Sequence, residues 1–205
     1  MAARYWVGGT GNWSDATNHW SDTSGGSPGA GFLPTSSDDV YLDNNSHTTN
    51  FTLTLDVNSD CLDFNTSELT TRICFFTNPT NDKVLSIYGS ITIYSNLIGI
   101  WGGNAMIIFK ATTSETIDIT GTWFYSNVVQ FNGIGGTWTF ISDANLLNTG
   151  IRLFNGTLDI NGFTVHVNTF ETATGTKTLT LGSGTFKMRA FYNTASTGFI
   201  FNYNT

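Results

Sequence analysis

Apolar and polar residues alternate with a period of two through most of the chain beyond residue 38, as in short β-strands with one buried face. A clear case begins at Ile117, where the alternation places Ile117 and Ile119 on one side of a strand and Asp118 on the other. No stretch keeps a 3.6-residue apolar pattern over three turns, so almost no helix is expected. The pattern predicts an all-β protein.

One short unit recurs in the second half of the chain: two apolar-x-apolar strands joined by a corner that contains glycine. Copies begin at Leu85, Ile117, Ile151 and Leu179, and a shorter copy at 136–140 keeps only the corner and the second strand. A glycine lets the chain turn sharply, with a positive φ or a close backbone approach. Spacings of 32, 15, 20 and 28 residues, which average near 24, separate the corner glycines Gly89, Gly121, Gly136, Gly156 and Gly184.

Two short strands that meet at a corner cannot bury their apolar face alone, whereas stacked copies of the unit can. A repeat near 24 residues fits one coil of a right-handed parallel β-solenoid (β-helix), with loops of variable length between strands. The alternative is an antiparallel β-sandwich or jelly roll, in which turn signals come about every 8–12 residues. The Asn-Gly pairs at 132–133, 155–156 and 161–162 do not join matched strands, which favours the solenoid.

The first 43 residues are rich in Gly, Ser and Asp and carry three of the six tryptophans, spaced seven residues apart at Trp6, Trp13 and Trp20. A solenoid leaves unpaired strands and apolar core at its end, so terminal repeats are atypical. We expect residues 1–43 to form an N-terminal cap whose tryptophans fold over the core, and residues 44–205 to form coils that could continue further. The alternative is an exposed aromatic platform for sugar rings.

Composition and charge restrict the classes of partner. The net charge is −7 and no cluster of Lys or Arg occurs, so nucleic-acid binding is not expected. No apolar run reaches membrane-spanning length, so membrane insertion is not expected either. Abundant Thr and Asn are typical of extracellular or virion β-proteins, yet the N-terminus lacks the pattern of a secretory signal. We therefore expect a protein that folds in the host cytoplasm and leaves by lysis.

Residues with catalytic chemistry are few. His19, His47 and His166 do not lie at metal-ligand spacing, and the alternation places His166 at an exposed strand position. No nucleophile elbow, phosphate-binding loop or dinucleotide motif occurs. Cys61 and Cys74 lie among apolar residues and are expected to be buried thiols. We expect no catalytic residue, no metal site and no cofactor.

Carboxylates are the remaining source of chemistry. A glycosidase needs two acids about 5–10 Å apart, and Asp118 and Asp159 hold loosely equivalent strand positions. We expect them to be surface aspartates that could face a glycan, and the alternative is a catalytic pair across a groove. Asp38, Asp39 and Asp43 are the densest acids and could bind Ca²⁺ or cap turns, although their spacing does not match an EF-hand loop.

The N-terminal pattern W-x-G-G-x-G-x-W … W-S … P … D-V-x-x-D is carried by Trp6, Gly8, Gly9, Gly11, Trp13, Trp20, Pro34, Asp39, Val40 and Asp43. It covers roughly the first fifth of the chain and resembles the opening of β-helical phage structural proteins and of autotransporter-like adhesins. The resemblance implies a non-enzymatic virion surface protein, either a tail fibre (adhesin) or a capsid decoration protein, that gives structural support and attaches to host glycans. The alternatives are a tailspike-like polysaccharide-degrading enzyme and a secreted bacterial adhesin at the cell surface.

The same resemblance implies partners. Phage fibres suggest a homotrimer that assembles with other virion proteins at the virion surface. Residues 198–205 still have a strand pattern with no closing cap, so another subunit or further chain is expected to cover this end.

Overall fold

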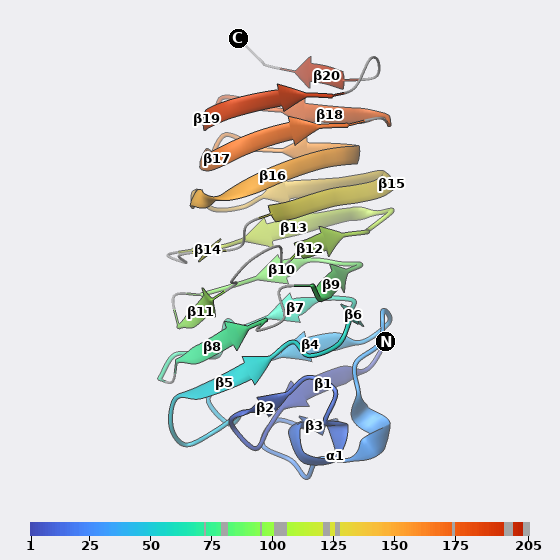
Figure 1. Ribbon diagram of the computed structural model, residues 1–205, viewed down its shortest axis with the longest axis vertical. Helices are drawn as coiled ribbons and strands as arrows, with labels where there is room; N and C mark the ends of the chain where they lie inside the picture. Colours follow the sequence, from blue (N-terminus) through green and yellow to red (C-terminus); the bar gives the residue numbers. More distant parts are fainter. Residues whose placement is uncertain are drawn as a thin grey trace.

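The computed structural model of the chain is a β-solenoid of about six turns, with 53% strand and 4% helix (Figure 1). The structure describes residues 1–71, 73–78, 82–94, 96–100, 106–120, 124–125, 128–173, 175–194 and 199–202. All pairings between described strands are parallel except the one that joins β1 (Ala3–Trp6) to β3 (Trp20–Ser21). The predicted parallel β-solenoid is confirmed, and the antiparallel alternative is wrong.

Each turn contributes strands to three faces, which we number by their order along the chain. Face 1 contains β1, β4 (Asp39–Tyr41), β7 (Phe64–Asn65), β10 (Ile91–Thr92), β13 (Ser114–Asp118), the last segments of β15 (Val128–Phe140) and β16 (Ala144–Asp159), β18 (Lys177–Thr180) and β20 (Phe199–Asn202). Face 2 contains β2 (Gly11–Asn12), β5 (Phe51–Thr54), β8 (Cys74–Thr77), β11 (Leu97–Ile100), β14 (Phe124–Tyr125) and the first segments of β16, β17 (Thr164–Thr172) and β19 (Thr185–Asn193). Face 3 contains β6 (Ser59–Cys61), β9 (Val84–Ile87), β12 (Met106–Phe109), the first segment of β15, the middle of β16 and the second segments of β17 and β19. Two short helices, α1 (Ala16–His19) and the 3₁₀ helix η1 (Ala30–Phe32), lie near the N-terminus.

The register between coils sets the length of one turn. Equivalent residues are 22 positions apart between β9 and β12 (Val84 and Met106) and 27 apart between β7 and β10 (Phe64 and Ile91). These lengths bracket the expected value near 24, and loops between the strands absorb the variation.

Inward side chains of successive strands stack in columns that form the core. On face 1, one column runs in register through Val40, Phe64, Ile91, Ile117 and Phe140, each at most 2% exposed. Burying a side chain of this size contributes about 1.5–3 kcal/mol relative to leaving it exposed. Stacked apolar columns therefore hold the coils together, in agreement with the alternation of the sequence.

The glycine corners belong to two different positions in the turn. Gly136 and Gly156 are in register at the corner from face 3 to face 1, and Gly89 lies at the same corner. Gly184 lies between β18 and β19, at the corner from face 1 to face 2. The prediction that the corner glycines occupy one equivalent position in the turn is therefore wrong. The reason is that apolar pairs flank a glycine at both corners. Gly121 lies outside the described residues.

Residues 1–43 contribute strands to the solenoid and also cover its end. β1 pairs in parallel with β4, and β2 pairs in parallel with β5. Helix α1, β3 and the loops around them lie beyond these strands, at the blue end of the stack (Figure 1). The expected boundary at residue 43 therefore does not separate a cap from the coils, because the covering segment is threaded between the first two strands of face 1.

The three N-terminal tryptophans are buried at this covered end. Trp6, Trp13 and Trp20 are at most 1% exposed. The ring of Trp20 packs edge-on against those of Trp6 and Trp13, with centroid distances of 5.0 and 4.9 Å. The indole Nε1 of Trp6 donates a hydrogen bond to the Gly9 oxygen at 2.7 Å, and that of Trp20 donates to the Trp13 oxygen at 2.7 Å. The rings are part of the core, with their polar atoms satisfied, and do not form an exposed platform for sugars.

The opposite end of the solenoid exposes apolar side chains. Strands β19 and β20 lie there (Figure 1), and Phe191, Tyr192 and Ile200 are 47%, 55% and 50% exposed. The strand expected near the end of the sequence is present as β20; residues 198 and 203–205 lie outside the described part of the chain.

A buried lysine stabilises the turn before β18. Lys177 is 0% exposed, and its Nζ donates hydrogen bonds to the backbone oxygens of Ala173 and of Gly175, the latter at 2.7 Å. Desolvation lowers the pKa of this ammonium group. The side chain thus supplies donors to a turn whose carbonyl groups point toward the interior.

Candidate functional site

A ladder of outward side chains runs along face 1, parallel to the long axis. Tyr5, Tyr41 and Asn65 are in register on the neighbouring strands β1, β4 and β7, and the same column continues through Thr92 and Asp118. These positions point outward because their neighbours along each strand, such as Val40 and Phe64, belong to the core. Register between parallel strands thus gathers residues from the first 118 positions into one surface column.

The two tyrosines form an aromatic pair on this ladder. Their ring centroids are 5.1 Å apart with an interplanar angle of 20°, close to the spacing of about 4.8 Å between neighbouring strands. Both side chains are partly exposed, and neither hydroxyl group has a hydrogen-bond partner among the described residues. Burial raises the pKa of Tyr41, and the nearby carboxylate of Asp39 adds to this effect. The Tyr41 phenol therefore stays protonated at neutral pH as a hydrogen-bond donor.

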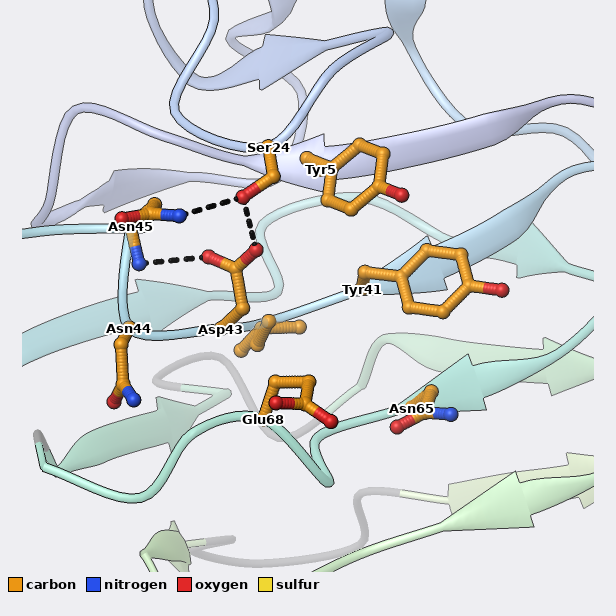
Figure 2. Close-up of a pocket in the computed structure, with 9 residues that line it drawn as sticks. Tyr5, Ser24, Tyr41, Asp43, Asn44, Asn45, Asn65 and Glu68 are labelled. Carbon is orange, nitrogen blue, oxygen red and sulfur yellow. Dashed lines mark hydrogen bonds between the residues drawn. The ribbon is translucent and has the colours of Figure 1, made fainter.

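A pocket of about 430 Å³ opens beside this tyrosine pair (Figure 2). It is lined by Tyr5, Ser24, Tyr41, Leu42, Asp43, Asn44, Asn45, Asn65 and Glu68, which we call the tyrosine pocket. Two aromatic rings, three amides and two carboxylates therefore surround one solvent-open hollow. In Figure 2 the Asn65 side chain is shorter than the Tyr41 ring, so the ring extends past its neighbour on the ladder.

One wall of the tyrosine pocket is held by a buried carboxylate. Asp43 accepts a hydrogen bond at Oδ2 from the Ser24 hydroxyl at 2.5 Å, and at Oδ1 from the Asn45 backbone N–H at 2.8 Å. The Asn45 side-chain amide donates to the Ser24 hydroxyl at 2.8 Å. With both oxygens engaged, Asp43 stabilises the wall and is not placed to act as an acid or base.

A second amide ties this wall to the next coil. The Asn44 Oδ1 accepts hydrogen bonds from the backbone N–H groups of Thr70 and Thr71 at 3.0 and 2.8 Å. Asn65 uses its Oδ1 to accept from the Ser67 N–H at 2.8 Å. The pocket therefore has a wall fixed before any ligand arrives.

Several polar groups of the pocket remain available to a ligand. Among the described residues, no hydrogen bond is made by the hydroxyls of Tyr5 and Tyr41, the amide NH₂ of Asn65 or the carboxylate of Glu68. Glu68 is exposed, whereas the other three side chains are partly exposed. The site thus offers hydrogen-bond donors and one charged acceptor around an aromatic surface, which is binding chemistry.

The structure places Asp118 and Asp159 on the same outer face but not opposite each other. Asp159 on β16 is in register with Thr139 on β15, which is in register with Thr116 on β13. Asp118 lies two residues after Thr116, so the two aspartates are two strands and two residues apart. Strand geometry puts their Cα atoms about 12 Å apart. The Asp118 Oδ1 accepts from the Thr120 hydroxyl at 2.7 Å, and the Asp159 Oδ1 accepts from the Asn161 N–H at 2.8 Å. They are partly exposed aspartates that cap turns, and Asp118 belongs to the ladder.

The acids of the N-terminal segment are also dispersed. Asp38 accepts from the Thr35 hydroxyl at 2.7 Å and lies 3.8 Å from the Arg4 Nε. Burial acts to raise the pKa of Asp38, but these partners outweigh it and hold the pKa below its ordinary value. Asp39 lies on face 1 and Asp43 in the pocket wall. Within the described residues, no group of three or more His, Cys, Asp or Glu side chains is arranged to hold a metal ion.

The histidines and cysteines lie apart from the pocket. His19 is buried, and its ring stacks on that of Trp6 with the centroids 4.6 Å apart. His166 is partly buried and its Nε2 atom is covered, which differs from the exposed position expected for this residue. Cys61 and Cys74 are free thiols with 0% exposure, as predicted, and burial raises the pKa of both.

Comparison with protein-family models, curated proteins and solved structures gave no match. The resemblance of the N-terminal motif to phage proteins and adhesins therefore stays a prediction. In the described part of the chain, no helix is long and apolar enough to cross a membrane.

Of the residues of the tyrosine pocket, only Asp43 was singled out from the sequence, as a possible Ca²⁺ ligand or turn cap. A local signal exists, because Tyr41 stands between the apolar residues Val40 and Leu42 and must point outward on a strand. The missing information was the register that brings Tyr5 beside it across 36 residues, a longer interval than in the later coils.

Proposed function

We propose that the protein is a non-enzymatic virion surface protein that supports the phage particle and attaches it to host glycans through the tyrosine pocket. The observation that carries the proposal is the stacked Tyr5–Tyr41 pair at the edge of a solvent-open pocket whose wall is already fixed by hydrogen bonds. Such a pocket can bind without first paying the cost of ordering its wall.

The chemistry of the pocket matches that of a sugar ring. A pyranose has a C–H face that packs on an aromatic ring and hydroxyl groups that donate and accept hydrogen bonds. The rings of Tyr5 and Tyr41 both line the hollow, and the Tyr41 ring extends past the shorter Asn65 (Figure 2). The Asn65 NH₂ and the tyrosine hydroxyls supply donors, and the Glu68 carboxylate supplies an acceptor.

The carboxylates favour binding over hydrolysis. Glycoside hydrolysis needs two acids on opposite sides of the scissile bond, one of which must exchange a proton. In the pocket, both oxygens of Asp43 already accept hydrogen bonds, and Glu68 is solvent-exposed. Asp118 and Asp159 lie two strands apart on one outer face and do not flank a common site. This arrangement supports an adhesin more than the tailspike-like enzyme.

The architecture suits the mechanical part of the proposal. Parallel coils joined by hydrogen bonds along the axis give a stiff rod, and the tryptophan cluster closes one end. Assembly as a homotrimer with other virion proteins follows from the motif resemblance. A secreted bacterial adhesin with the same pocket is the second candidate, since the glycan chemistry is shared.

The first test is a glycan array probed with the folded protein and two variants. We expect the wild type to bind a subset of glycans and Tyr41→Ala to lose more than ten-fold in affinity, because a stacking face and a donor are removed. Tyr192→Ala is the matched control: this exposed tyrosine lies on β19, at the far end of the solenoid, and its loss should leave binding unchanged. Absence of binding to every glycan, or equal loss in both variants, would overturn the proposal.

The second test locates the protein. Immunogold electron microscopy with antibody against this chain should label phage particles, on tails for a fibre and over capsids for a decoration protein. Label confined to cell envelopes, with bare particles, would replace the virion proposal with the bacterial adhesin.

A further inference from the structure

The tyrosine pocket carries negative charge in its lining and has further carboxylates beside it on face 1. Glu68 lines the pocket and is exposed, and Asp43 lies in the wall. A second outward column on face 1 runs next to the ladder. It contains Asp39, two residues before Tyr41 on β4, and Asp63, which lies immediately before β7 and two residues before Asn65.

The acids of this second column interact unfavourably with one another. Burial raises the pKa of Asp63, and the charges of Asp39 and Glu115 raise it further, against the hydrogen bond that its Oδ1 accepts from the Ser90 N–H at 2.7 Å. The Asp39 Oδ1 is buried with no hydrogen-bond partner among the described residues. A further anion placed here would meet carboxylates that are already poorly compensated.

No cation offsets this charge in the described lining of the pocket, which contains neither Lys nor Arg. Arg4 lies on β1 beside Tyr5, but its guanidinium packs over the Phe32 ring at 5.4 Å and faces Asp38 at 3.8 Å. This arginine is therefore engaged beneath the sheet and does not reach an anion bound on the outer face.

We propose that the tyrosine pocket selects uncharged glycans and excludes those that carry carboxylate or sulfate groups. The inference rests on the proposed glycan binding and specifies its ligand class. At the effective dielectric constant of about 20 near a protein surface, a like charge about 12 Å away lowers affinity roughly ten-fold, and a nearer charge lowers it further. The charge of these carboxylates does not weaken the binding of uncharged sugar hydroxyls, which can still donate hydrogen bonds to the Glu68 carboxylate.

The test uses paired probes that differ only in charge. Neutral oligosaccharides that the wild type binds on the array are compared with their sialylated, sulfated or uronic-acid counterparts, and dextran is compared with carboxymethyl-dextran. At low salt, each neutral member should bind at least ten-fold more tightly than its anionic partner. In 1 M NaCl the ratio should shrink, because the screening length falls to about 3 Å.

Glu68→Gln assigns the effect to the pocket. This variant keeps the size of an exposed side chain and one acceptor oxygen but removes one charge. The ratio of neutral to anionic affinity should therefore fall about five-fold, whatever the change in neutral affinity itself. Asp60→Asn, on β6 of face 3, is the matched control and should leave the ratio unchanged.

The outcomes separate the two proposals. Equal or tighter binding of anionic members overturns the charge selection but leaves glycan binding in place. A ratio that Glu68→Gln does not change overturns the assignment to this pocket. Absence of binding to any glycan overturns the proposed function, and the selectivity with it.

Discussion

The corner at Gly156 gives the sharpest test of how closely the coils are packed. Gly156 has a φ of +88°, and a Cβ placed there would lie 2.6 Å from the Gly136 oxygen, 2.7 Å from the Gly133 oxygen and 2.8 Å from Cζ3 of Trp138. The left-handed backbone costs a non-glycine residue about 1–2 kcal/mol. Overpacking against backbone atoms that cannot swing aside adds about 1–3 kcal/mol. We expect Gly156→Ala to lower the free energy of unfolding by about 2–5 kcal/mol.

Two other glycines separate these contributions. Gly162 has a φ of +86°, but a Cβ there would meet only the Ser183 hydroxyl, at 3.2 Å. Gly162→Ala should therefore cost only the backbone part, about 1–2 kcal/mol. Gly31 has no atom within 4 Å of the added Cβ, so Gly31→Ala should change stability by less than about 0.5 kcal/mol.

Urea denaturation followed by far-ultraviolet circular dichroism measures the series, with the slope of the transition compared between variants. From most to least destabilised, we expect the order Gly156→Ala, Gly162→Ala, Gly31→Ala. If Gly156→Ala is no worse than Gly162→Ala, close backbone approach at the corner between faces 3 and 1 is refuted as the constraint.

Three further predictions use the same denaturation assay. Trp20→Ala should lower the free energy of unfolding by about 3–5 kcal/mol, because it leaves a cavity in the core at the covered end. Trp101 lies outside the described residues and does not serve as a control. Lys177→Met should lower the free energy of unfolding by about 1–3 kcal/mol, because the Ala173 and Gly175 oxygens lose the donor that this buried side chain supplies. Lys187→Met on β19 should cost less, and equal losses would contradict this role. Asp63→Asn should stabilise the protein at pH 7, because the pKa of Asp63 is raised in the folded state and its ionised form therefore opposes folding. The gain in stability should vanish below the unfolded-state pKa near 3.9, where the carboxyl group is protonated in both states. A gain that persists at pH 3 would contradict the electrostatic cause.

The strands and the core were predictable because their pattern is local. Alternation alone placed Ile117 inward and Asp118 outward, as found, and the burial of Cys61 and Cys74 followed from their apolar neighbours. The covered end was also predictable from composition, since a run of tryptophans in a glycine-rich segment has few other places to bury its rings.

The pocket was not predictable, because it depends on register between coils of unequal length. One turn takes 36 residues between Tyr5 and Tyr41, since the covering segment lies between them, but 24 residues between Tyr41 and Asn65. No fixed period connects the three positions. For the same reason the two kinds of glycine corner looked equivalent, because a local pattern does not tell which vertex of the turn it occupies.

The in-register stacking of coils has a consequence for how the molecule opens. Each coil contacts only its neighbours, so thermal opening spreads inward from an end and a defect in one coil stays local. The indole cluster at Trp6, Trp13 and Trp20 seals the end that carries the tyrosine pocket. Opening of the first coil has to expose these buried rings, so the pocket lies in a part of the solenoid that resists fraying.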